Sequence, residues 1–116
     1  MKNVNQAING FQHRLISKDK NKIEAIILYG SFVNGDYQPK DSDIDIMVLA
    51  KDKSIDEDIL DIETMISLKY GVVISALLTT RKELQRAKSA GYLFPDEVLK
   101  GRVIYERGKG RSKISH

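Results

Sequence analysis

The sequence contains no cysteine, so disulfide bonds and thiolate metal sites cannot contribute to its fold. It also has no uninterrupted run of about 18 apolar residues, the length that a membrane-spanning helix needs. No signal-peptide pattern, internal repeat or low-complexity block appears, and we therefore expect a cytoplasmic protein that does not bind membranes. Its 116 residues, of which 41% are hydrophobic, are enough for one domain with a single core.

Positive charge gathers at the end of the chain. The formal net charge is +3, yet residues 107–116 carry four basic side chains and no acidic one, namely Arg107, Lys109, Arg111 and Lys113. Residues 1–106 are then close to neutral, so nucleic acid is not expected as a direct substrate. The segment 107–116 lacks apolar periodicity and is expected to be a disordered basic tail. It could contact RNA or an acidic partner, although a solvated terminus is the simpler interpretation.

Hydrophobic periodicity predicts helices alternating with short strands. Helices are expected over residues 3–17 and 54–71, for about ten residues after Thr80, and briefly from Pro95; strands are expected over residues 23–30, 43–49, 72–78 and 102–105. This order predicts an α/β (α+β) fold with a small mixed sheet flanked by helices. Two capping boxes, Ser54 with Glu57 and Thr80 with Glu83, are predicted to begin two of the helices.

Two aspartates open the second predicted strand, in the stretch DSDIDIMVL. Because strand side chains alternate between faces, Asp43 and Asp45 point the same way while Ile44 and Ile46 point into the core. Two neighbouring carboxylates repel each other unless a cation lies between them. Magnesium suits such a pair, because it prefers one or two protein carboxylates and completes its shell with water and phosphate oxygens. A solvated strand end remains the alternative for this pattern taken alone.

A glycine–serine pair, Gly30-Ser31, follows the first predicted strand. Gly30 has no Cβ to block a close ligand, and the Ser31 hydroxyl and nearby N–H groups can donate to a phosphate. Such a pair is often only a turn. Combined with an aspartate pair on the next strand, however, it provides a phosphate cradle beside a magnesium site, which is the equipment for nucleotidyl transfer.

The stretch GSFVNGDYQPKDSDIDIMV resembles the signature of the DNA polymerase beta nucleotidyltransferase superfamily, and most of all that of its minimal nucleotidyltransferase (MNT) group. The resemblance covers residues 1–106, which would form the nucleotidyltransferase domain. It implies that Gly30 and Ser31 bind the nucleotide phosphates, and that Asp43 and Asp45 are the catalytic carboxylates that bind Mg²⁺. ATP is the implied nucleotide.

Three departures from the family pattern stand out. The spacer between Ser31 and Asp43 is slightly longer than is common, and Asn34 replaces a frequent arginine. The superfamily usually places a third carboxylate on the next strand, where this chain has Val73. Ser75 shares the expected face of Val73 but is not an acid. The resemblance therefore supports one metal–triphosphate site and leaves two-metal chemistry in question.

Proteins of this group commonly have a HEPN-domain partner, and some neutralise that RNase toxin by transferring AMP to one of its tyrosines. The resemblance thus implies a magnesium-dependent transferase that moves AMP from ATP to a protein hydroxyl, as the antitoxin of a HEPN toxin. The alternative is a catalytically weak module that neutralises its partner by complex formation. Transfer to a small molecule such as an aminoglycoside would need an acceptor domain for which 116 residues leave little room. An oligomer is compatible with either reading.

Overall fold

The computed structural model describes residues 2–38 and 43–108. Its elements follow one another as helix α1 (Lys2–Asp19), the 3₁₀ turn η1 (Lys20–Lys22), strand β1 (Ile23–Tyr29), the short helix α2 (Ser31–Asn34), strand β2 (Ile44–Ala50), helix α3 (Asp56–Tyr70), strand β3 (Ile74–Thr80), helices α4 (Arg81–Ser89) and α5 (Phe94–Leu99), and strand β4 (Arg102–Glu106). The alternation predicted from periodicity is confirmed, with boundaries that move by a few residues.

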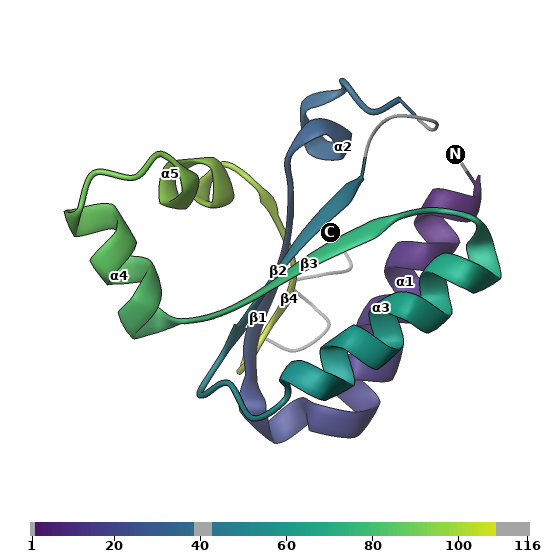
Figure 1. Cartoon of the computed structure of the whole chain (residues 1–116), viewed down its shortest axis with the longest axis horizontal. Helices are drawn as coiled ribbons and strands as arrows, with labels where there is room; N and C mark the ends of the chain where they lie inside the picture. Colours follow the sequence, from purple (N-terminus) through teal and green to yellow (C-terminus); the bar gives the residue numbers. More distant parts are fainter. Residues whose placement is uncertain (1, 39–42, 109–116) are drawn as a thin grey trace.

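The four strands form one mixed sheet in the order β3-β2-β1-β4. Strand β1 is antiparallel to both β2 and β4, whereas β2 and β3 run parallel. Helices α1 and α3 lie on one face of the sheet and α4 and α5 on the other (Figure 1). The predicted class, a small mixed sheet flanked by helices, is therefore confirmed.

The main core lies between the sheet and the pair α1–α3. It includes Phe11 and Leu15 of α1 together with an isoleucine face of α3. This face consists of Ile55, just before the helix, and of Ile59, Ile62 and Ile66, all buried. A smaller cluster lies under α5 on the opposite face, where Val98 packs with Met47 and Leu49 of β2. Both faces of β2 are thus covered along most of its length, which explains its continuous apolar run.

One of the two predicted capping boxes is wrong. Thr80 accepts a hydrogen bond from the Glu83 N–H, and the Glu83 carboxylate accepts one from the Thr80 N–H, as predicted. At α3, by contrast, the N-cap is Ile55 and no side chain caps the helix. Ser54 is engaged elsewhere, because its hydroxyl accepts from Lys22 Nζ at 3.0 Å.

The free edge of β3 is covered by side chains of α3. Since the Val73 carbonyl accepts from the Ile44 N–H on the β2 side, the N–H groups of Ile74 and Ala76 point to the outer edge. The Ala76 N–H donates to Glu63 Oε2 at 2.7 Å, and the Ile74 N–H donates to Ser67 Oγ at 3.3 Å. Two edge amides that could otherwise pair with a strand of another chain are therefore already hydrogen-bonded.

The tail predicted over residues 107–116 falls mostly outside the described residues, which end at Gly108. Arg107 continues the pairing of β4, since its N–H donates to the Glu24 carbonyl at 2.8 Å. Within the described ranges, none of the helices has both the length and the apolar character that crossing a bilayer requires.

Candidate active site

The turn from β1 into α2 is built on a conformation that only glycine adopts readily. Gly30 has φ 77° and ψ −152°, and it caps the single turn of α2, whose Asn34 N–H donates to the Gly30 carbonyl at 3.0 Å. Gly35 closes α2 in the left-handed region with φ 84°. Ser31 is therefore the first residue of α2; it is half-buried, and its hydroxyl bonds to no other residue that the structure describes.

Gly30 and Asp45 are brought into direct contact by the pairing of β1 with β2. Tyr29 lies opposite Asp45 in this antiparallel ladder, so the residue that follows Tyr29 reaches the Asp45 side chain. A Cβ built on Gly30 would overlap the Asp45 carboxylate, with its Cγ only 3.0 Å away. The glycine–serine turn and the aspartate pair, separated in the sequence, thus meet at one end of the sheet.

Asp43 precedes β2 and is exposed, whereas Asp45 is half-buried. The pKa of Asp45 is raised above its usual value, first by burial, then by the charge of Asp43 and then by that of Glu97. Neither aspartate has an ion pair with a lysine or arginine among the described residues. Within the described part of the chain, the two carboxylates therefore form an uncompensated negative site at the start of β2.

This site has the chemistry that a magnesium ion requires. Two carboxylates from alternate positions of one strand are hard oxygen ligands, and their mutual repulsion would be relieved by a divalent cation. The absence of a Cβ on Gly30 leaves the space in which the Asp45 carboxylate lies against the turn. No group of three histidine, aspartate or glutamate side chains within the described part of the chain is arranged to hold a metal, so further ligands would come from water and the nucleotide.

The next strand brings no carboxylate to Asp43 and Asp45. The parallel ladder pairs Asp45 with Ser75, and the bond from the Ile44 N–H to the Val73 carbonyl places Val73 beside Asp43. Val73 lies just before β3 and is 56% exposed. The predicted position of Val73, on the carboxylate side of the sheet, is confirmed.

Sequence reasoning missed three residues around the aspartates. They are Glu97 on α5, Tyr29 and Tyr37. Burial is the largest cause of the raised pKa of Asp45 and of Tyr29, and the charge of Glu97 adds to it in both cases. Burial and then the charge of Asp43 raise the pKa of Tyr37. The sequence gives no signal for Glu97, because its place depends on α5 packing over β1 through Val98.

Comparison with known proteins gives consistent results. The family model described as Polymerase beta, Nucleotidyltransferase matches residues 12–110. Two proteins of Methanocaldococcus jannaschii, each named "Putative protein adenylyltransferase", are similar to the chain. One is 39% identical over 105 residues, covering 89% of this chain and 99% of the relative; the other is 32% identical over 76 residues, covering 63% and 76%.

A solved structure named "putative nucleotidyltransferase", from Sulfolobus solfataricus, is 20% identical with a TM-score of 0.47, covering 95% of this chain and 92% of that one. The family match spans the elements from within α1 to the end of β4, including the glycine–serine turn and both aspartates. On this match, the chain belongs to the polymerase beta nucleotidyltransferase family.

Proposed function

We propose that this protein is a magnesium-dependent adenylyltransferase that moves AMP from ATP to a hydroxyl group of another protein. The observation that carries the proposal is that the Gly30 turn meets the Asp45 carboxylate, since a Cβ on Gly30 would overlap it. The choice of AMP and of a protein acceptor is supported by the names of the relatives and by the minimal nucleotidyltransferase signature.

In this proposal, each residue of the site has one task. Asp43 and Asp45 hold the metal, and Ser31 donates its hydroxyl to a triphosphate oxygen from the start of α2. Gly30 lets the Asp45 carboxylate lie directly against the glycine–serine turn, because any side chain at Gly30 would overlap it. Bound magnesium would neutralise charge on the phosphate oxygens as the α-phosphate is attacked.

The reaction transfers one group and releases one product. The acceptor oxygen forms a bond to the α-phosphorus of ATP, and the bond from that phosphorus to the bridging oxygen of pyrophosphate breaks. The acceptor proton passes to solvent or to a neighbouring carboxylate, and pyrophosphate leaves. From the family resemblance, we propose a tyrosine of a HEPN-domain RNase toxin as the acceptor, which would make this protein an antitoxin.

A second candidate function is favoured by one observation. Val73 lies on the carboxylate side of the sheet, and from the family resemblance it stands where the superfamily usually has a third acid. A valine can neither bind a metal nor accept a proton. The protein would then bind nucleotide and partner with little transfer, and would neutralise the toxin by forming a complex. In that case Asp43 and Asp45 are retained for binding rather than for turnover.

AMP transfer measured with labelled ATP distinguishes the two functions. The protein is incubated with magnesium and a co-expressed HEPN-domain protein, and label on the acceptor is located by mass spectrometry. The first proposal predicts label on a tyrosine, lost in Asp43→Asn and Asp45→Asn. A tight complex that protects against the toxin without any label would establish the binding module instead, and neither label nor complex would refute both.

A further inference from the structure

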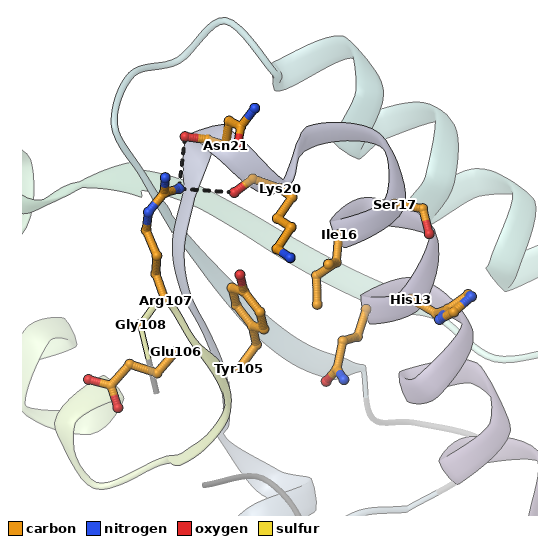
Figure 2. Close-up of a pocket in the computed structure, with 10 residues that line it drawn as sticks. His13, Ile16, Ser17, Lys20, Asn21, Tyr105, Glu106, Arg107 and Gly108 are labelled. Carbon is orange, nitrogen blue, oxygen red and sulfur yellow. Dashed lines mark hydrogen bonds between the residues drawn. The ribbon is translucent and has the colours of Figure 1, made fainter. Parts of the chain in front are cut away.

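A second candidate site lies far from the aspartates. A pocket of about 620 Å³ opens between α1, η1 and the end of β4 (Figure 2). It adjoins the first residues of β1, whereas Gly30 and Asp45 lie beyond the other end of that strand. Tyr105 belongs to the core on the α1 side of the sheet, while Asp45 is on the α5 side. The volume falls within the range of small-molecule sites.

The pocket contains a tyrosine hydroxyl that has no partner among the described residues. Tyr105 is only 9% exposed, and none of residues 2–38 or 43–108 forms a hydrogen bond with its hydroxyl. Figure 2 shows the Tyr105 hydroxyl directed into the same space as the Lys20 side chain, with Ile16 beside them. The ring of Tyr105 is buried while its hydroxyl is open to the pocket, so the hydroxyl can donate to an acceptor on a ligand.

The charge beside this hydroxyl is also unused. The neighbouring lysines are paired, Lys18 with Asp58 at 3.0 Å and Lys22 with Asp52 at 3.1 Å. Lys20, between them, has no ion pair with any residue that the structure describes. Glu106 also lines the pocket, but it is engaged with another group and points away from Tyr105 in Figure 2. The space above Tyr105 therefore faces a free cation and lacks a compensating anion.

Arg107 links two walls of the pocket. Its Nη1 donates to the carbonyls of Lys20 at 3.1 Å and Asn21 at 2.9 Å, which ties the end of β4 to η1. These bonds connect the backbone of η1, which carries Lys20, to the end of β4, which carries Tyr105.

We propose that this pocket binds a small organic anion, whose phosphate or carboxylate group contacts the Tyr105 hydroxyl and the Lys20 ammonium and whose apolar body rests on Ile16 and the Tyr105 ring. The chain that continues beyond Gly108 is a poor occupant on grounds of charge, since it carries Lys109, Arg111 and Lys113. The site is independent of nucleotidyl transfer, because it lies on the other face and at the other end of the sheet.

The test is a titration of the full-length protein in EDTA, without nucleotide, followed by backbone amide NMR shifts and calorimetry. The probes are phenyl phosphate and benzoate, with neutral benzamide as the uncharged control. We expect one or both anions to shift the amide signals of Ile16, Lys20 and Tyr105. We expect benzamide to bind with an affinity at least about tenfold lower, a difference of about 1.4 kcal/mol in binding free energy. Comparing the two anions decides between phosphate and carboxylate.

Three variants make the test specific. Tyr105→Phe keeps the ring and removes only the hydroxyl, and Lys20→Gln changes an exposed side chain, so both are expected to fold. Each should weaken anion binding about tenfold, whereas Lys18→Gln, two residues away at the end of α1 and paired with Asp58, should leave it unchanged. Shifts of equal size with benzamide, unchanged binding in Lys20→Gln, or no shift with either anion would each overturn the proposal.

Discussion

At the scale of single residues, Gly30 is required both by the backbone conformation of the turn and by the contact of the turn with the Asp45 carboxylate. Its φ of 77° and ψ of −152° disfavour any side chain, and a Cβ would also meet the Asp45 carboxylate. Gly35 provides a matched comparison, because its φ is also positive, at 84°, but a Cβ there would meet nothing within 4 Å.

Gly30→Ala should therefore lower the free energy of unfolding by about 2 kcal/mol more than Gly35→Ala does. It should also abolish magnesium-dependent ATP binding, whereas Gly35→Ala should retain it. Urea unfolding and calorimetry measure the two effects. Equal stability losses, with ATP binding retained in both variants, would show that the contact with Asp45 has no role in the site.

Val73 offers a test of the missing acid. It lies beside Asp43 and is exposed, so an aspartate there could join the carboxylate pair without disturbing the core. Val73→Asp should raise the rate of AMP transfer at least about tenfold, or about 1.4 kcal/mol of barrier. Leu77→Asp is the control, because Leu77 is also exposed on β3 but pairs with Met47, farther along the strand. A faster transfer in the Leu77 variant alone, or in neither variant, would contradict the assignment of Val73 as the position of the missing carboxylate.

At the scale of elements, the contact of α3 with the edge of β3 has a measurable consequence. Glu63 accepts the outward N–H of Ala76 at 2.7 Å. Glu63→Ala should cost about 1 kcal/mol of stability and speed hydrogen exchange of the Ala76 amide. Glu63→Gln keeps an acceptor and should fall in between. If exchange at Ala76 is the same in all three proteins, the edge is protected by something other than Glu63.

The elements themselves could be predicted from the sequence, because apolar periodicity and the Thr80–Glu83 box reflect local geometry. The Ser54–Glu57 box failed for a reason that is not local: Lys22, from the end of η1, donates to the Ser54 hydroxyl, and Asp52 accepts the Ser54 N–H at 2.9 Å. A sequence pattern cannot show which of several partners, distant along the chain, a serine will take.

In the candidate site, too, some features could be predicted from the sequence and others depend on residues that are distant along the chain. The contact between Gly30 and Asp45 was implied by the family signature, since the turn and the pair serve one nucleotide. The nearness of Glu97 was not predictable, because it depends on Gly101 turning the chain against the Leu28 carbonyl and on β4 pairing with β1. The pocket at Tyr105 depends on the same pairing, which brings the end of the chain next to α1.

At the scale of the whole molecule, the pH dependence of stability should be governed partly by Asp19, where α1 ends beside the start of α3. Burial, then a hydrogen bond with Asp58 and its charge, raise the pKa of Asp19 to about 6. The Asp19 Oδ2 atom is buried and has no hydrogen-bond partner among the described residues. The protonated form is therefore favoured in the folded state, and its stabilisation is complete below the unfolded value of 3.8 and is lost as the pH rises through about 6.

Asp19→Asn should consequently be more stable than the natural protein above pH 6, by about 1 kcal/mol, with the difference vanishing below pH 3.8. Thermal unfolding across this range measures it, with Asp36→Asn, in an exposed loop, as the control. A difference that is constant with pH would show that Asp19 does not titrate in this window.

The central claim is that Asp43 and Asp45 form a metal site that binds the triphosphate of a nucleotide held at Gly30 and Ser31. Calorimetric titration with ATP in magnesium and in EDTA tests it most directly, because it requires neither an acceptor nor turnover. We expect ATP to bind at least about tenfold more tightly with magnesium, and the variant carrying both Asp43→Asn and Asp45→Asn to lose this difference while it remains folded. Equal ATP affinity with and without magnesium in the natural protein would contradict it.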